Sequence, residues 1–218
     1  MAFVQHAQTL GEILRHEYAS IQHTRTKVLL KGLGSSKDFK IGMLISKEIT
    51  NTVTPDGGNT GDGVLTVAGI LHDVQIGAYV CTCIAIAANG GTFKVIAPNG
   101  ERLDDAVVGT ATSQHLTFTI ADGATDFALG DKITITTVES GKWLQYDESG
   151  LIGDKIAAGV LISDITVPAS TDTYEAAIVR GPVVFTDEGI DFNSANAAQK
   201  ALTLIRLEKL DIHVKKEV

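Results

Sequence analysis

The chain has 218 residues and a mass of 23.0 kDa, which suits one large domain or two small ones. Its 44% hydrophobic and 20% charged residues exclude a disordered chain. A formal net charge of −8 argues against nucleic acid as the main partner, because a phosphate-binding face needs clustered Lys and Arg. No apolar run approaches the ~20 residues of a membrane span, and the N-terminus lacks the basic start and apolar stretch of a signal peptide.

Residues 1–26 are predicted to form an arm that contains a short helix. Thr9 and Glu12 have the spacing of a capping box. The apolar residues that follow at helical spacing are Leu10, Ile13 and Leu14. A helix this short is marginal alone in water, so we expect the apolar stripe to be ordered by packing, either on its own body or on a partner.

The arm also differs from the rest of the chain in charge. Residues 1–31 carry four basic and two acidic side chains, whereas residues 32–218 carry 14 basic and 24 acidic ones. A mildly basic arm on an acidic body indicates an arm that reaches toward another surface. An ordinary fluctuation of surface charge explains the difference equally well.

The next part of the chain is predicted to be β-structure. Residues 27–31 and 39–50 have the composition and alternation of strands. The turn-rich residues 54–63 then introduce a stretch in which short strands and turn signals alternate every eight to twelve residues. The strands expected there are 77–87, 92–97, 116–120 and 132–137. This spacing is typical of a β-sandwich or barrel, and residues 53–137 hold three basic and nine acidic side chains.

The two cysteines, Cys81 and Cys83, lie two positions apart in an expected strand and so point to the same face. That geometry disfavours a disulfide between them, and a lone pair is a poor metal site. Both are interpreted as small buried residues, in a protein whose fold does not depend on disulfides and which is assembled in cytoplasm.

After residue 138 the pattern resembles that of residues 27–50. Strands are expected at 143–147, 159–166, 175–185 and 211–214. A final helix is predicted to be capped by Asn193 or Ser194 and to end near Lys209. Its expected buried residues are Ala198, Ala201, Leu202, Ile205 and those from Leu207 to Leu210. The prediction is a mainly β fold, in which residues 27–52 and 138–218 form one discontinuous core domain and residues 53–137 an inserted sandwich-like or barrel-like domain.

The sequence contains no recognisable catalytic constellation. It has no phosphate-binding loop, nucleophile elbow or zinc-protease motif. The acidic pairs and triplets at 104–105 and 122–131 are interpreted as turn residues, with a carboxylate pair or a metal site as the alternative. Trp143 and Tyr146 are interpreted as core or subunit-interface anchors, with a ligand platform as the alternative. We therefore expect no enzyme activity, cofactor or metal.

Several segments, in their order along the chain, resemble the lambda-like head decoration proteins of tailed bacteriophages. They are FKIGMLISK, WLQYDESGLIGDKIAAGVLISDITV, YEAAIVRGPVVF and AQKALTLIRLEKLDIHVKK. The features shared with that family are Tyr146-Asp147, the step from Ala158 to Leu161, and Val179-Arg180-Gly181, while Met43-Leu44-Ile45 departs from its commoner ending. The insert is similar to a β-domain found inside some members. The resemblance implies a β-rich protein that sits as homotrimers on the outside of an expanded capsid, with an N-terminal arm ordered on the major capsid protein.

The function expected from this resemblance is to stabilise the shell against internal DNA pressure, as a virion protein on the outer capsid surface. The candidate capsid contacts are the apolar Leu10, Ile13, Leu14 and Tyr18 and the charged Arg15 and Arg25. The inserted domain would face outward. The alternative is an adhesion module that binds a receptor or host surface glycans. The aromatic residues of the insert are Tyr79, Phe93, Phe118 and Phe127, and their strand positions favour a core role over a glycan platform.

Overall fold

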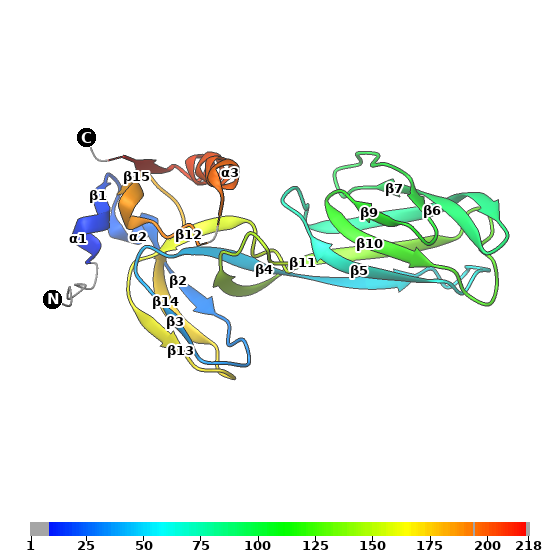
Figure 1. Ribbon diagram of the computed structural model, residues 1–218, viewed down its shortest axis with the longest axis horizontal. Coiled ribbons are helices and arrows are strands. Elements are labelled where there is room, and N and C mark those ends of the chain that lie inside the picture. The colour runs from blue at the N-terminus through cyan, green and yellow to red at the C-terminus, as the bar shows by residue number, and fades with distance from the viewer. Residues whose placement is uncertain (1–8, 194, 217–218) are drawn as a thin grey trace. The chain divides into compact units, whose positions relative to one another are not determined.

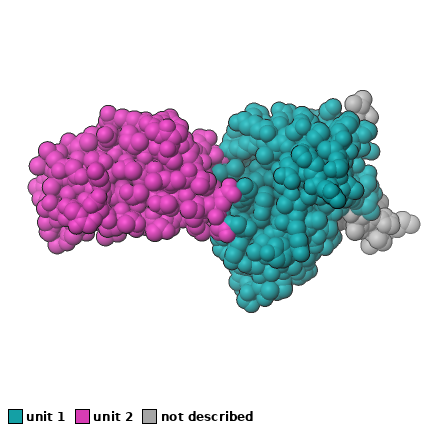
Figure 2. All heavy atoms as spheres, turned by 180° about the vertical axis from the view of Figure 1, so that it is seen from behind, with its two compact units in different colours: residues 1–48, 141–150, 154–218 teal, residues 49–140, 151–153 magenta. Residues whose placement is uncertain are grey.

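The computed structural model describes residues 9–193 and 195–216 (Figure 1). The chain divides into two compact units (Figure 2). Unit 1 comprises Met1–Glu48, Gly141–Gly150 and Asp154–Val218, and unit 2 comprises Ile49–Ser140 and Leu151–Gly153. The boundaries predicted at 52/53 and 137/138 differ from the observed divisions, which fall within two long strands. Turn-rich composition marks where loops lie, but it does not mark where a strand passes from one unit to the next.

Unit 1 is mostly β-structure with one long helix. Its largest sheet has the order β2-β14-β12-β4-β11, a second has the order β1-β15-β16, and β3 pairs with β13. Its strands are β1 (Leu14–Glu17), β2 (Arg25–Leu30), β3 (Lys37–Phe39), β12 (Ala157–Leu161), β13 (Ile165–Val167), β14 (Thr173–Ile178), β15 (Val183–Thr186) and β16 (Ile212–Lys215), and it shares β4 (Leu44–Pro55) and β11 (Lys132–Gln145) with unit 2. Its helices are α1 (Leu10–Ile13), α2 (Ile21–Thr24), the 3-10 turn η1 (Asp187–Gly189) and α3 (Ala197–Lys209).

The core of unit 1 joins residues that are far apart in the sequence. Ile13, Tyr146, Phe185 and Leu207 all belong to one buried cluster, and each is at most 1% exposed. These residues come from α1, the end of the β11 segment, β15 and α3. The N-terminal segment, the central strands and the C-terminal helix therefore depend on one another for burial.

Several expected strands differ from the structure. The strand expected at 159–166 is divided into β12 and β13, and the strand expected at 175–185 into β14 and β15. Residues 39–50 are not one strand, because β3 and β4 are separated by a turn in which Gly42 has φ +85°. A Cβ at Gly42 would lie 2.1 Å from the carbonyl oxygen of Gly189, so this turn needs glycine on two counts. In the other direction, the separate strands expected at 132–137 and 143–147 form the single strand β11.

The C-terminal helix was predicted correctly as an element, and the predicted buried residue Leu207 is buried, but the cap and most of the predicted buried face were wrong. Asn196 is the cap, because its side-chain oxygen accepts hydrogen bonds from the backbone N–H groups of Ala198 and Gln199 at 3.0 and 3.1 Å. Asn193 lies before the helix, and Ser194 lies outside the described residues. The buried side chains are Thr203 and Leu207. The predicted buried residues Ala198, Ala201, Leu202 and Ile205 are exposed.

Unit 2 contains two antiparallel sheets that enclose their own core. One continues from β11 in the order β11-β6-β7-β8, and the other has the order β5-β10-β9. The strands are β5 (Val64–Ile70), β6 (Gly77–Ala87), β7 (Gly90–Ile96), β8 (Ala106–Val107), β9 (Ala111–Ser113) and β10 (Leu116–Ala121). The expectation of a mainly β fold with one long C-terminal helix and a small barrel-like domain is confirmed.

The alternation that predicted β6 holds for its first half only. Tyr79, Cys81 and Cys83 are each at most 2% exposed. The register with β7 then shifts between Cys83 and Ala85, and residues 84–87 are all exposed. The bulge interrupts the regular alternation, so the inward series ends at Cys83.

Candidate functional site

The N-terminal segment is built into unit 1. The predicted capping box is present, since the Glu12 carboxylate accepts a hydrogen bond from the backbone N–H of Thr9 at 2.6 Å. The capped helix α1 places Ile13, which is 1% exposed, against η1. A Cβ added to Gly189 would lie only 2.3 Å from Cγ2 of Ile13, which measures how closely the two segments pack.

This packing corrects the candidate capsid contacts. Ile13 is in the core, and Leu10 and Leu14 pack against the same buried cluster. The apolar stripe was expected to pack either on its own body or on a partner, and in the structure it packs on unit 1. These three side chains therefore stabilise unit 1 and do not form an exposed apolar contact.

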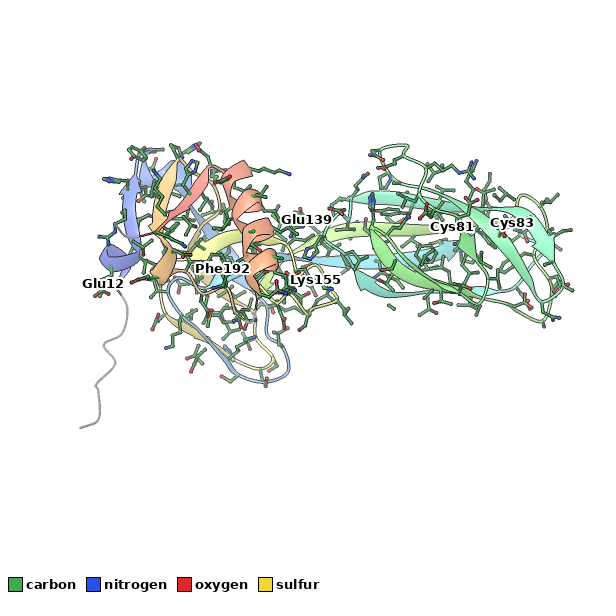
Figure 3. All side chains as sticks on the ribbon, turned by 45° about the horizontal axis from the view of Figure 1, so that its top comes forward. Glu12, Cys81, Cys83, Glu139, Lys155 and Phe192 are labelled. Atoms are coloured by element: carbon green, nitrogen blue, oxygen red, sulfur yellow. The ribbon has the colours of Figure 1, made fainter. Side chains whose placement is uncertain are left out.

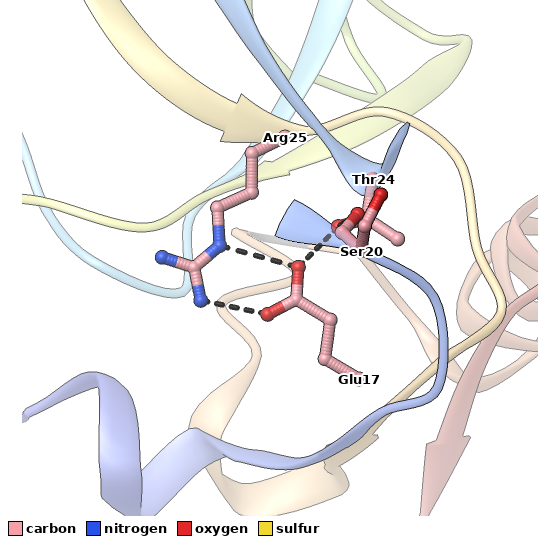
Figure 4. A network of polar contacts seen from close by, with 4 residues as sticks. All are labelled: Glu17, Ser20, Thr24 and Arg25. Carbon is pink, nitrogen blue, oxygen red and sulfur yellow. Dashed lines mark hydrogen bonds and ion pairs between the residues drawn. The ribbon is translucent and has the colours of Figure 1, made fainter. Parts of the chain in front are cut away.

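Arg25 is also engaged within unit 1, where it joins β1 to β2 (Figure 4). Its Nη2 and Nε donate to the Glu17 carboxylate at 2.7 and 3.2 Å, and Thr24 Oγ1 donates to the same carboxylate. The hydrogen bonds from Arg25 lower the pKa of Glu17, and those to Glu17 raise the pKa of Arg25. The charge of Arg25 thus holds the N-terminal segment in place.

Tyr18 and Arg15 remain on the surface. The side chain of Tyr18 is 69% exposed, and its ring stacks on His16 with the ring centroids 5.4 Å apart. The backbone N–H of Tyr18 donates to the carbonyl of Pro182 at 3.0 Å, which fixes the chain as it leaves β1. Of the six predicted contact residues, these two present exposed side chains, Arg15 from β1 and Tyr18 from the residue that follows it.

An open groove of about 500 Å³ lies beside these residues. Its lining comes from three strands of the β1-β15-β16 sheet: Arg15 and His16 from β1, Val184 and Thr186 from β15, and Lys215 from β16. The C-terminal lysines are not among the predicted contact residues. The signal that was available is the pair Lys215-Lys216 at the end of an expected strand, but its position beside Arg15 follows from the sheet order.

Tyr146 is a core residue and Trp143 lies at the edge of a core. The Tyr146 hydroxyl donates to Glu148 Oε2 at 2.6 Å and lies 3.0 Å from Thr203 Oγ1. Burial raises the pKa of Tyr146 to about 12. Trp143 is half-buried and packs against a second cluster that includes Leu30 and Phe39. The structure therefore places both residues as anchors inside unit 1.

The two cysteines are buried. Cys81 and Cys83 lie inside unit 2 as free thiols (Figure 3), and burial raises the pKa of Cys81 to about 12. Across residues 9–193 and 195–216, no three His, Cys, Asp or Glu side chains are grouped so that they could hold a metal ion. In the same residues, no helix has the length and apolarity needed to cross a bilayer.

Asp131 shows how the turn carboxylates of unit 2 are used. Its side chain is buried and accepts hydrogen bonds from the backbone N–H groups of Thr60, Gly61 and Ala128 at 2.9 to 3.0 Å. Burial acts to raise the pKa of Asp131, but these three hydrogen bonds outweigh it, and the pKa lies below its usual value of 3.8. The loop before β5 is held by this carboxylate, as expected for turn chemistry.

Comparison with known proteins gives few matches. No family model matches the chain, and no curated protein matches it. Two crystal structures of Xanthomonas campestris FlgL, in space groups H3 and C2, are similar over part of the chain. They are 18% and 17% identical, cover 46% and 44% of this chain, and have a TM-score of 0.31. The chain spans about a third of the length of FlgL (34% and 31%), and a likeness at this TM-score carries no argument about fold or function.

Proposed function

We propose that this protein is a structural head decoration protein of a tailed bacteriophage, which binds the outside of the expanded capsid as trimers and stabilises it. The observation that carries the proposal is the placement of the segments that resemble the lambda-like family. β4, the residue after β11, β12, α3 and β16 all contribute to the same buried cluster of unit 1, through Leu44, Tyr146, Val160, Leu207 and Ile212. Leu44 lies before the insertion of about 90 residues and the other four lie after it, so segments on its two sides build one core.

The proposed mechanism is preferential binding to one state of the shell. A protein that bridges neighbouring capsid subunits in the expanded state, and does not bind the earlier state, stabilises the expanded state by its binding free energy. Assembly as trimers joins three weak contacts into one avid attachment. No catalytic step is required, which suits the structural use of the cysteines and carboxylates described above.

The adhesion alternative loses its chemical basis in unit 2. Glycan binding by a β-domain commonly uses an exposed aromatic ring, but Tyr79, Phe93, Phe118 and Phe127 are each at most 4% exposed. Phe93 and Phe127 pack edge to face with ring centroids 4.9 Å apart. These four rings form the core of unit 2, so we propose that unit 2 faces outward without a glycan-binding role.

The test is co-sedimentation of the full-length protein with expanded, undecorated shells of the partner capsid protein. We expect saturable binding at a stoichiometry that is a multiple of three. A variant that lacks residues 1–26 would lose Ile13 from the core, so the informative variants are one that begins at Thr9 and the substitution Tyr18→Ala. Tyr174→Ala is the matched control, because Tyr174 is 56% exposed on β14, a strand that does not border the groove.

The outcomes separate the two functional classes. Binding to expanded shells that is weakened by Tyr18→Ala and unchanged by Tyr174→Ala supports decoration through the β1 surface. If the full-length protein fails to bind expanded shells but binds host cells on its own, the decoration proposal is overturned in favour of adhesion.

A further inference from the structure

Unit 2 holds both Asn-Gly steps of the chain, Asn89-Gly90 and Asn99-Gly100. An asparagine that precedes glycine is chemically labile, because the backbone nitrogen of the glycine can attack the side-chain amide carbon without obstruction by a Cβ. Both asparagines are exposed and both lie in turns. Sequence and exposure therefore do not distinguish the two steps, whereas the hydrogen bonds around each side chain do.

The side chain of Asn99 is held by its neighbours. Its Oδ1 accepts a hydrogen bond from the backbone N–H of Glu101 at 2.9 Å, and its Nδ2 donates to Glu101 Oε2 at 3.4 Å. Its backbone N–H donates to Gln75 Oε1 at 3.1 Å. The N–H of Gly100, which would be the attacking group, donates to the carbonyl of Ala97 at 2.9 Å. Attack on the amide carbon of Asn99 therefore requires an ordered set of contacts to be broken.

The side chain of Asn89 is not held in this way. Its backbone N–H donates to Asp126 Oδ1 at 3.0 Å, but in the part of the chain that the structure describes no hydrogen bond involves its side-chain amide. Asn89 has φ +53° and lies in the turn between β6 and β7, where Ala87 pairs with Gly90. The fold thus fixes the backbone of Asn89 and leaves its amide free to rotate toward the nitrogen of Gly90.

We propose that Asn89 is a site of spontaneous deamidation, and that its contacts protect Asn99 from the same reaction. The backbone nitrogen of Gly90 forms a bond to Cγ of Asn89 and loses its proton. The bond from Cγ to Nδ2 breaks, and the amide nitrogen leaves with that proton as ammonia. Water then opens the resulting succinimide at one of its two carbonyls, which gives aspartate or isoaspartate. The reaction involves no change of oxidation state, and the inference does not depend on the proposed function.

The two products have different effects on the hairpin. Aspartate keeps the length of the backbone and adds a negative charge close to Asp126, within residues 84–91, which otherwise carry no charge. Isoaspartate adds one carbon to the main chain, so the turn can no longer keep Ala87 opposite Gly90. Hydrogen exchange at the end of the β6–β7 hairpin should therefore accelerate as isoaspartate accumulates.

The experiment incubates the full-length protein in mildly alkaline buffer made with water enriched in heavy oxygen, which marks each deamidation that occurs during the incubation. Proteolysis and mass spectrometry then give separate rates for Asn89 and Asn99. Each rate is divided by that of a short synthetic peptide, residues 86–93 or 96–103, so that the effect of the local sequence is removed. We expect the ratio for Asn89 to exceed that for Asn99 by at least about tenfold, because the side-chain hydrogen bonds of Asn99 must first be broken.

Gly90→Ala is the informative variant. A Cβ at Gly90 would lie 3.6 Å from the Cβ of Ala87, which is an ordinary contact, so the turn can accept it. The same Cβ obstructs the attacking nitrogen, and we expect the reaction at Asn89 to slow by at least about tenfold while that at Asn99 is unchanged. A circular dichroism melt of the variant establishes that the fold is retained.

Three results would overturn the inference. The first is a corrected rate for Asn99 that equals or exceeds that for Asn89, because the hydrogen bonds would then give no protection. The second is an unmodified Asn89 after a period in which its peptide has reacted completely, because the turn would then block the attack. The third is an unchanged rate at Asn89 in Gly90→Ala, which would show that ammonia is lost without attack by the backbone nitrogen.

Discussion

The two units are both β-rich, but they are assembled from the chain in different ways. Unit 2 consists of one continuous stretch, Ile49–Ser140, with only Leu151–Gly153 added to it. Unit 1 joins three segments, and its core places Ile13 against residues such as Phe185 and Leu207. Contacts between such distant residues close long loops, which has an entropic cost that local hairpins largely avoid. Unit 1 is therefore the unit whose stability depends on the whole chain.

The units differ equally in charge and in what they offer a partner. The acidic excess of the protein lies almost entirely in unit 2, whereas unit 1 is close to neutral and has its cations gathered beside β1. The difference suggests a division of roles, with attachment through unit 1 and an anionic, solvated surface on unit 2. The following substitutions test whether the two units respond separately.

The largest effect is expected from Ile13→Ala in the core of unit 1. Removal of a buried aliphatic side chain leaves a cavity against Gly189, and we expect the free energy of unfolding of unit 1 to fall by about 2–5 kcal/mol. Trp143 is the single tryptophan and lies in unit 1, so its fluorescence during denaturant titration reports this unit. Unit 2, followed by hydrogen exchange of β6 amides, should not change.

Ile21→Ala is the matched control for that variant. Ile21 is 59% exposed on α2, so the same chemical change should alter stability by less than about 0.5 kcal/mol. Equal effects of the two substitutions would contradict the assignment of α1 to the core and would restore the apolar stripe as an exposed contact.

The next largest effect is expected in unit 2, from Asp131→Asn. The asparagine amide nitrogen would face backbone N–H groups that now donate to a carboxylate oxygen, so we expect a loss of about 1–3 kcal/mol. Hydrogen exchange at Thr60 and Gly61 should accelerate, while Trp143 fluorescence should report unchanged unit 1 stability. Asp126→Asn is the control, because Asp126 is exposed and accepts a hydrogen bond from the backbone N–H of Asn89 at 3.0 Å.

The same carboxylate predicts an acid response of unit 2. The pKa of Asp131 is lower in the folded protein than the ordinary value of 3.8, so the folded state binds its proton less tightly than the unfolded state does. The stabilisation of unit 2 by the ionised Asp131 carboxylate is therefore complete above pH 3.8, and it is lost as the pH falls through the lowered pKa of the folded state. Wild-type unit 2 should lose more stability than the Asp131→Asn variant over this interval, and parallel curves would contradict the prediction.

A smaller effect is expected from Glu17→Gln in unit 1. The substitution removes the charge that pairs with Arg25 while keeping one acceptor oxygen, and partial exposure of Arg25 to solvent limits the loss to about 1–2 kcal/mol. Because the pKa of Glu17 is lowered from 4.5, this contribution is present above pH 4.5 and is lost as the pH falls through the lowered folded value. Denaturant titrations of both proteins should therefore differ at pH 7, and the difference should narrow steadily as the pH is lowered below 4.5.

The control for the ion pair is Asp105→Asn. Asp105 pairs with Arg102 three residues away on the surface of unit 2, at 3.0 Å. Exposed pairs of this kind contribute little, so a change below about 0.5 kcal/mol is expected. A loss as large as that of Glu17→Gln would show that burial is not what gives the Glu17 pair its strength.

The sequence was most informative where a segment folds on its nearest neighbours. The strand at 77–87 and the capping box of Thr9 and Glu12 were predicted from local patterns and are present in the structure. The buried face of α3 could not be predicted in this way, because the helix carries apolar residues on both faces. Thr203 faces inward, where its hydroxyl lies 3.0 Å from that of Tyr146, 57 residues earlier in the chain.

The same limit applies to the candidate site. Residues Arg15 and Tyr18 were selected from the charge and apolar pattern of the N-terminal segment, but that pattern does not reveal that Ile13 would be buried against Gly189. Nor does it place Lys215 in the same groove, since this requires β15 to lie between β1 and β16. Sheet order is a property of the whole unit, and local periodicity carries no information about it.

The smallest effects on stability are expected from removing one buried tyrosine hydroxyl in each unit. Tyr146→Phe leaves the hydroxyl of Thr203 without its side-chain partner in unit 1, and Tyr79→Phe removes the acceptor of the Gln75 backbone N–H, now at 2.7 Å, in unit 2. Each should cost about 0.5–1.5 kcal/mol in its own unit only, because the two residues share no partner. The double variant should therefore show the two losses separately, the first by Trp143 fluorescence and the second by hydrogen exchange in β6. If Tyr79→Phe shifts the Trp143 transition as much as Tyr146→Phe does, the units unfold as one cooperative body, and the division of roles between them would have to be argued from surface chemistry alone.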